Sequence, residues 1–244
     1  MIRIGNGQGF WGDSIDAPVN LAQGGPLDYL TLDYLAEITL SIMQKQKLKN
    51  PNAGYAKDFI DLIKRILPEI QQKGLKVITN AGGVNPLACR DALLNISDKN
   101  IKIGVIKGDD IFSDMKTFRN EGVTFDNMDT GESFEDIADR VYSANVYINS
   151  FTIAEALKKG AQIVLAGRVS DPGLALGPCV YEYGWGNNEY DKIAAGTLAG
   201  HITECGAQCS GGNYSNWQDV PNMHNLGYPI IEMEHDGKFC ITKQ

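Results

Sequence analysis

The sequence lacks any excess of positive charge. Its 22 Lys and Arg residues are outnumbered by 30 Asp and Glu residues, which gives a net charge of −8 at pH 7. Binding to nucleic acid or to an anionic membrane surface requires clustered Lys and Arg side chains. We therefore expect neither nucleic acid nor a membrane as a partner. Small anionic ligands remain compatible with this charge, because backbone N–H groups at helix starts can hold them.

Long apolar runs and paired cysteines are also missing. No apolar run approaches the about 20 residues that a membrane-spanning helix needs. The N-terminus does not resemble a secretion signal, and the cysteines are odd in number and scattered. We therefore predict reduced thiols and a cytoplasmic location. The cysteines are Cys89, Cys179, Cys205, Cys209 and Cys240.

The chain does contain a recurring succession of apolar strand, polar loop and helix. The clearest example is residues 75–86, where an apolar run ends on Asn80, continues through Gly82 and Gly83, and reaches Pro86. A buried strand that ends on a glycine-rich polar loop is where open α/β folds place their ligands. The succession recurs without a fixed period. It predicts an α/β fold with a mainly parallel sheet flanked by helices, doubly wound and Rossmann-like.

Apolar periodicity and turn residues give the boundaries of the expected elements. Strands are predicted at residues 2–4, 27–32, 75–79, 101–106, 145–148 and 162–166. Helices are predicted at residues 34–49, 56–73, 87–97, 152–159, 174–183 and 189–204. In the helix at 34–49, the stripe that includes Ile38, Ile42 and Met43 is expected to pack on the sheet.

Two segments fall outside this regular pattern. Residues 111–144 are acidic and poor in aliphatic side chains, and we predict an excursion over the edge of the sheet that could serve as a lid. Residues 229–233 and 238–242 alternate around an Asp-Gly turn, which predicts a β-hairpin near the C-terminus. We assign residues 1–212 to an α/β core domain and 213–244 to a hairpin segment that looks truncated, because its last strand would be uncovered.

The first polar loop, residues 5–13, has the spacing Gly-x-Gly-x-Gly. Phe10 stands where the dinucleotide-binding fingerprint needs its third glycine, so a nucleotide-dependent oxidoreductase is disfavoured. The loop is either a tight turn that needs positive φ angles or a loop whose backbone approaches a ligand. Its amides favour the second interpretation. The predicted ligand-binding residues are Asn6, Gly7, Gln8, Gly9, Asn80, Gly82, Gly83, Asn85 and Gly167.

Charged side chains follow several of the predicted strands. Arg168 could clamp a carboxylate or a phosphate with two hydrogen bonds, or it could pair with Asp171 and only order the loop. Asp33 either caps the following helix or supplies a carboxylate at the end of its strand. Carboxyl groups in a partly dry site can be tuned to exchange protons near neutral pH. The predicted catalytic residues are Asp13, Asp109, Arg168, Asp171 and His201.

His201, Glu204 and Cys205 share one face of the last predicted helix. A metal site is one interpretation, but zinc sites show paired Cys or His spacings, and only one His is present here. An acid–base pair of His201 and Glu204 is another interpretation. Tight packing of a helix rich in small residues is the simplest. We predict no metal and no cofactor.

Five blocks of this sequence stand out together, namely Gly5–Asp13, Gly25–Leu30, Thr79–Pro86, Ala166–Asp171 and Ala194–Gln208. Over essentially the whole chain, they resemble the acyclic terpene utilisation family, AtuA type. The resemblance implies a role in the breakdown of acyclic terpenes such as citronellol and geraniol, or of branched acids through CoA esters. It also implies proximity to acyl-CoA enzymes and to biotin-dependent carboxylase subunits, and a further ferredoxin-like C-terminal domain that is absent from this chain.

Two functional hypotheses follow. The first is an enzyme with lyase, hydratase or hydrolytic chemistry on an acyl-CoA or carboxylate, its site lying where the polar loops converge at the carboxyl edge of the sheet. The second is a non-catalytic subunit that binds the same anionic ligand or CoA ester, or that scaffolds a partner of the acyl-CoA carboxylase type. A homo-oligomer is compatible with either hypothesis.

Overall fold

The computed structural model describes residues 1–97 and 101–243, and its centre is a seven-stranded sheet with the order β4-β5-β3-β2-β1-β6-β7. The five strands β1 to β5 are parallel, whereas β6 and β7 form an antiparallel hairpin beside β1. This confirms the predicted α/β class and the predicted hairpin. The strands are β1 (Ile2–Gln8), β2 (Tyr29–Leu32), β3 (Lys76–Thr79), β4 (Ile103–Val105), β5 (Ile163–Leu165), β6 (Pro229–Met233) and β7 (Phe239–Lys243).

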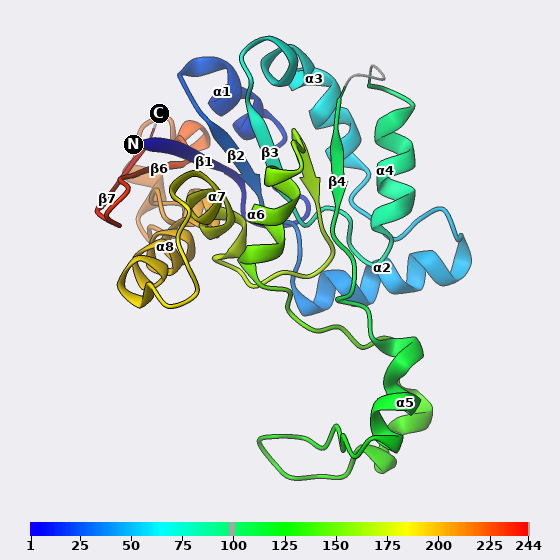
Figure 1. The fold of residues 1–244 in the computed structure, drawn as a ribbon. Coiled ribbons are helices and arrows are strands. Elements are labelled where there is room, and N and C mark those ends of the chain that lie inside the picture. The colour runs from blue at the N-terminus through cyan, green and yellow to red at the C-terminus, as the bar shows by residue number, and fades with distance from the viewer. Residues whose placement is uncertain (98–100, 244) are drawn as a thin grey trace.

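Helices cover both faces of the sheet (Figure 1). They are α1 (Asp16–Gly24), α2 (Glu37–Lys49), α3 (Asp58–Gln72), α4 (Pro86–Leu94), α5 (Met115–Asn120), α6 (Ser150–Lys158), α7 (Gly173–Tyr183) and α8 (Tyr190–Thr203). Short 3₁₀ turns occur at Phe112–Asp114, Phe134–Asp136, Ala138–Arg140, Gly206–Gln208, Trp217–Asp219 and Met223–Asn225. Among the helices of the described residues, none has both the length and the apolar character needed to cross a bilayer.

Alternating strand residues build two separate hydrophobic cores. Leu30 and Val77 point toward α1, α3 and α4, whereas Tyr29 and Ile78 point toward α6 and α7. This alternation follows from the two-residue repeat of a strand, which sends successive side chains to opposite faces. A sheet covered on both faces requires apolar residues on both faces of its strands, and the fully buried β5 meets that requirement.

The direction of winding changes between the neighbouring strands β3 and β5. The chain leaves β3 for α4 on one face and leaves β5 for α7 on the other. Such a switch point is where open α/β sheets form a ligand crevice. Here the two loops touch, since a Cβ atom added to Gly82 would lie 2.5 Å from the carbonyl oxygen of Ala166. Glycine at position 82 is therefore needed for this close approach.

Residues 111–144 form an arm that projects beyond the carboxyl edge of the sheet (Figure 1). Its own small core contains Phe118, Phe125 and Phe134, whose rings contact each other in sequence. The two ends of the arm lie next to each other, because the N–H of Ile111 donates to the carbonyl of Ala144. The predicted strand at residues 145–148 is wrong: these residues make isolated bridges, Asp110 to Asn145 and Ile148 to Val169.

Helix α2 differs from its prediction in both its start and its buried face. The carboxylate of Asp33 accepts the N–H of Leu35 at 3.2 Å, which keeps these residues outside the helix. The helix begins at Glu37 instead of residue 34, so Asp33 is not its cap. The side chain of Met43 is buried as predicted, but Ile38 is 77% exposed and Ile42 is 44% exposed. These two isoleucines therefore face away from the sheet, contrary to the prediction.

Candidate functional site

The carboxyl ends of β1 to β5 lie at one edge of the sheet because these strands are parallel. The loops that follow them, residues 9–14, 33–36, 80–85, 106–110 and 166–171, therefore meet there. Most of the residues predicted for the site belong to these loops, including Asp13, Asn80, Asp109 and Arg168. Of the others, Asn6, Gly7 and Gln8 belong to β1 itself, and His201 lies exposed on α8.

Asp33 is one of two carboxyl groups buried at this edge; 4% of its surface is exposed, against 3% for Asp109. It accepts hydrogen bonds from the side-chain amide of Asn80 at 2.6 Å and from the N–H of Leu35 at 3.2 Å. Burial raises the pKa of Asp33 to about 7, and the charge of Glu204 acts in the same direction. The two hydrogen bonds and the charge of Arg168 oppose this shift. Asp33 can therefore hold or release a proton near neutral pH.

A small polar cavity adjoins Asp33. Its volume is about 10 Å³, which leaves room for about one water molecule. The side-chain amide of Asn6 lines it and donates to the carbonyl of Thr203, which ties β1 to α8. The cavity is too small for a metabolite, so any substrate must lie elsewhere. Its lining residues are Asn6, Thr31, Asp33, Asp171, Leu174, Ala175, Gly200, Thr203 and Glu204.

The guanidinium group of Arg168 is almost entirely enclosed, because only 3% of this residue is exposed. Its Nη1 donates to the carbonyl oxygens of Leu35 and Val169, each at 3.2 Å. Its Nη2 lies 2.9 Å from Oδ1 of Asp171. The ion pair with Asp171, one of the two interpretations of the sequence, is therefore present. The ring of Tyr147 lies 4.3 Å from the guanidinium carbon. The geometry shows Arg168 ordering loops, and a contact with ligand stays a prediction.

Asp109 connects the loop after β4 to the loop after β5. Its Oδ2 accepts the N–H of Arg168 at 2.8 Å and the side-chain amide of Asn145 at 3.1 Å. A Cβ atom at Gly167 would collide with this carboxylate, so glycine is required for the contact. Burial raises the pKa of Asp109 above its usual range. Gly167 thus has a packing role that does not involve a ligand.

A pocket of about 260 Å³ opens between the loops after β3 and β4. Two lysines line it, and Nζ of Lys47 donates to the carbonyl of Val84 at 2.7 Å. The start of α4 also faces the pocket, where the unpaired N–H groups and the dipole of a helix favour negative charge. Its lining residues are Lys47, Gly83, Val84, Asn85, Pro86, Leu87, Lys107, Gly108, Asp109, Asp110 and Ser113.

Three of the predicted residues, Gly83, Asn85 and Asp109, thus line this pocket. The sequence analysis did not predict the two lysines that also line it. Asn85 anchors the loop, since its side-chain amide donates to the carbonyls of Pro51 and Ala53 at 2.8 Å each. Lys107 directly follows the predicted strand at residues 101–106, and this position was a signal that could have identified it. Lys47 comes from the buried side of α2, and only the packing of that helix brings it to the pocket.

The loop after β1 is closed by its own side chains. Asp13 accepts the N–H of Gly9 at 3.1 Å and the hydroxyl of Tyr228 at 2.6 Å. The side-chain amide of Gln8 donates to the carbonyl of Phe10 at 3.2 Å. A Cβ atom at Gly9 would lie 2.6 Å from the carbonyl oxygen of Cys205. Close packing accounts for Gly9, and the ligand-binding role predicted for this loop stays a prediction.

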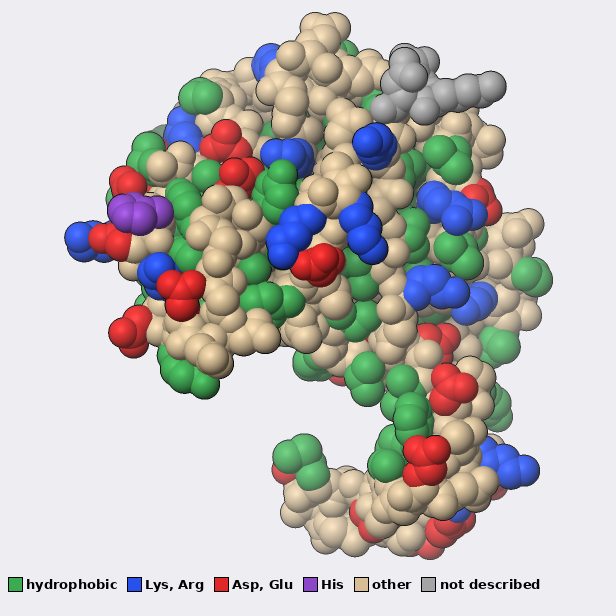
Figure 2. All heavy atoms as spheres, viewed as in Figure 1, with side chains coloured by type: hydrophobic (Ala, Val, Ile, Leu, Met, Phe, Trp, Pro, Cys, Tyr) green, Lys and Arg blue, Asp and Glu red, His purple; other side chains and the backbone are tan. Residues whose placement is uncertain are grey.

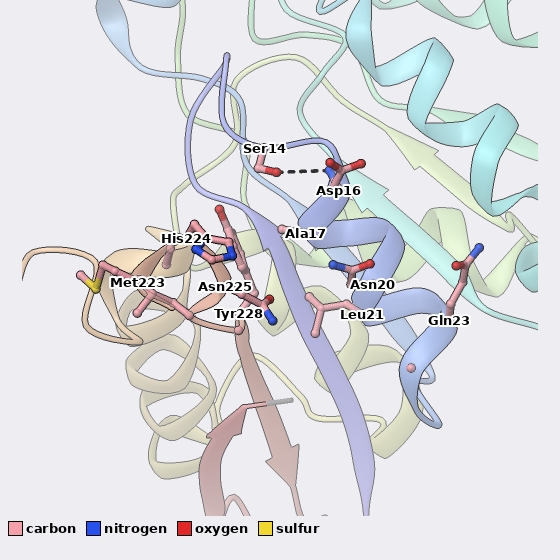
Figure 3. A pocket seen from close by; sticks show the side chains of 14 residues that line it. Ser14, Asp16, Ala17, Asn20, Leu21, Gln23, Met223, His224, Asn225 and Tyr228 are labelled. Atoms are coloured by element: carbon pink, nitrogen blue, oxygen red, sulfur yellow. Dashed lines mark hydrogen bonds between the residues drawn. The ribbon is translucent and has the colours of Figure 1, made fainter. Parts of the chain in front are cut away.

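A larger groove runs along α1 instead of opening at the predicted loops. It has a volume of about 870 Å³ and lies between α1 and residues 223–228. Figure 3 shows His224, Asn225 and Tyr228 beside β1, with Ser14 and Asn20 across from them. Its one acidic side chain, Asp16, pairs with Arg65 at 2.7 Å. No Lys or Arg lines this groove, so the smaller pocket at the carboxyl edge suits an anion better.

The His201–Glu204–Cys205 cluster does not form as a unit. His201 is exposed, whereas Glu204 faces the small cavity at Asp33 and accepts the thiol hydrogen of Cys205 at 2.9 Å. Within residues 1–97 and 101–243, no three His, Cys, Asp or Glu side chains are arranged to hold a metal ion. The small residues of α8 pack closely, and a Cβ atom at Gly200 would lie 2.7 Å from the carbonyl oxygen of Pro172.

Comparison with known protein families identifies the family of the chain. Residues 2–244 match the family described as acyclic terpene utilisation family protein AtuA. The chain belongs to this family. Membership indicates a role in acyclic terpene utilisation. Searches of the curated proteins and of the solved structures returned no significant match.

Proposed function

We propose that this AtuA family member is an enzyme that binds a small branched carboxylate, or its CoA ester, at the carboxyl edge of the sheet. The observation that carries the proposal is the pocket lined by Lys47, Lys107 and the start of α4. In a chain of net charge −8, two lysines and a helix N-terminus in one pocket offer a local site for an anion. The resemblance to this family implies branched acids and their CoA esters as substrates, so an anionic substrate agrees with it.

The size of the pocket limits what it can enclose. Pockets for drug-sized ligands measure about 300–1,000 Å³, whereas this one measures about 260 Å³. It can take a short acid whole, or the carboxylate or phosphate end of a CoA ester. Figure 2 shows the molecule hollowed between the arm and the body, which leaves open space beyond the carboxyl edge.

The buried Asp109 carboxyl group supplies a candidate proton carrier in the same pocket. Because burial raises its pKa, it retains a proton at a higher pH than an exposed aspartate does. A carboxyl group with these properties suits lyase, hydratase or hydrolytic chemistry, all of which move a proton to or from the substrate. Arg168 acts on this group by donating its N–H to Asp109.

The binding test uses isothermal calorimetry with a short branched carboxylate and with its CoA ester. We expect K47M and K107M each to weaken binding by about tenfold to 100-fold, since a hydrogen bond to a charged group contributes about 1.5–3 kcal/mol. K158M, which removes an exposed lysine at the end of α6, is the matched control. If both pocket variants bind as tightly as K158M, the site is wrong.

A second function is favoured by one observation. The donors of Arg168 are directed to carbonyls and to Asp171 inside the protein, as expected of a scaffold that only binds. In that case the chain would be a non-catalytic subunit that presents its ligand to an acyl-CoA carboxylase-type partner. Turnover of the CoA ester by the isolated chain, lost in D109N while binding persists, supports the enzyme. Binding without turnover supports the subunit.

A further inference from the structure

Helix α2 carries a surface stripe that no other part of the described chain covers. Ile38, Ile42, Lys45 and Lys49 follow each other at helical spacing and so share one face, and Leu48 adjoins them. Ile38 is 77% exposed and Leu48 is 65% exposed, while both lysines lie on the surface. We name these five residues the α2 outer face. An exposed patch of apolar side chains with a charged rim is typical of a protein contact surface.

The arm, residues 111–144, presents the opposite charge. It contains eight acidic and three basic side chains, which gives it a net charge of −5. Figure 2 shows these acidic side chains gathered on the arm, below Lys and Arg side chains on the body. At the tip of the arm the side chain of Met128 is 95% exposed, with Asp129 next to it. The arm therefore combines an apolar tip with acidic neighbours.

The tip is held in a defined shape by hydrogen bonds. Oδ1 of Asn127 accepts the N–H groups of Asp129 and Thr130, at 2.9 and 3.1 Å. The N–H of Gly131 donates to the carbonyl of Asn127 at 2.7 Å. A pre-ordered tip loses little conformational freedom on binding, so it is suited to docking as a rigid unit.

The base of the arm lies beside α2. The side-chain amide of Gln44 donates to the carbonyl of Tyr142 at 3.0 Å, and the hydroxyl of Tyr147 donates to Glu37 at 2.6 Å. In Figure 1, α2 crosses below the strands, and the arm extends away from it. One region of the surface thus carries both an acidic projecting arm and a basic apolar face. Such a region is self-complementary, which is the requirement for a two-fold interface between identical chains.

We propose that two copies of this chain form a two-fold dimer in which the arm of each copy docks on the α2 outer face of the other. Met128 enters the apolar part formed by Ile38 and Ile42, and the acidic residues of the tip meet Lys45 and Lys49. The partner is a second copy because both complementary surfaces belong to the same chain and start from adjacent positions. This inference is independent of the ligand pocket.

Analytical ultracentrifugation of the full chain tests the dimer, with two charge-reversal variants. K45E/K49E reverses the α2 outer face, and D129K/E132K reverses the arm tip. Each variant alone places like charges across the interface, so the dimer dissociation constant should rise by about 100-fold. An equimolar mixture of the two variants should dimerise again, because both contacts in the mixed dimer then join opposite charges. K158E/K159E, on the exposed end of α6, is the matched control.

Two further measurements keep the test decisive. Circular dichroism shows whether each variant is folded. Comparing the dimerisation of M128D with that of L198D shows whether the exposed apolar residue of the arm matters more than an exposed apolar residue of α8. The proposal predicts a wild-type mass of twice 26.6 kDa, and dissociation by M128D but not by L198D. A monomeric wild-type chain at high concentration overturns it. So does a wild-type dimer that folded K45E/K49E and D129K/E132K leave intact.

Discussion

The buried carboxyl group of Asp33 gives the sharpest test of the site's electrostatics. Its pKa is raised from 3.8 to about 7 in the folded chain, mainly by burial. The folded state therefore binds a proton more tightly than the unfolded state does. The contribution of Asp33 to stability is fully present below about pH 4 and is lost as the pH rises through about 7. Ionising this group thus destabilises the fold at neutral pH.

The size of this effect follows from the shift. Each pKa unit corresponds to about 1.4 kcal/mol, so the full loss is on the order of 4 kcal/mol. That is a large share of the about 5–15 kcal/mol by which ordinary domains are stable. In D33N the side chain cannot ionise, while its amide oxygen can still accept from Asn80 and Leu35. The variant should therefore lack this part of the pH dependence.

Urea unfolding from about pH 4 to about pH 8 measures the difference. Other carboxyl groups also titrate in this range, so the informative quantity is the wild-type profile minus the D33N profile. D191N, which changes an exposed aspartate at the start of α8, is the control and should leave the profile unchanged. If the wild-type and D33N curves run parallel, Asp33 does not change its protonation across this range, and the conclusion that it can hold or release a proton near neutral pH fails.

Two further predictions concern packing and thiol access. G82A should destabilise the fold by about 1–3 kcal/mol, because its Cβ would lie 2.5 Å from the carbonyl oxygen of Ala166. G25A, which adds a Cβ in open space, is the control, and equal urea midpoints for the two variants would contradict the close approach. Iodoacetamide should label the exposed Cys240 well before Cys89, since burial raises the pKa of the Cys89 thiol. Peptide mass spectrometry measures this order, and early labelling of Cys89 in the folded chain would refute its burial.

The hairpin shows where local sequence was sufficient to predict the structure. An Asp-Gly turn between two alternating runs predicts β6 and β7 without knowledge of the rest of the fold. The domain boundary after residue 212 stays a prediction, although β6 pairs with β1 in the same sheet. The predicted strand at residues 145–148 failed because strand propensity cannot tell a ladder from isolated bridges.

Helix α2 shows where apolar periodicity led to a wrong prediction of the buried face. Ile38 and Ile42 follow a helical spacing as faithfully as Leu40 and Met43 do, and the sequence does not say which stripe is buried. The crossing of α2 below the strands decides this, and the same crossing brings Lys47 to the pocket. Neither consequence can be read from the amino acids of α2, because both depend on what packs against it.

The sequence by itself determined the α/β class, the family and the set of polar loops that follow the strands, because these depend on local periodicity, turn residues and long matching blocks. Only the tertiary structure decided how those loops are used. It enclosed Arg168 between two carbonyls and Asp171, and it raised the pKa of Asp33 by burying the carboxyl group. Burial and charge at a site are sums over neighbours from distant parts of the chain, and only folding brings those neighbours together.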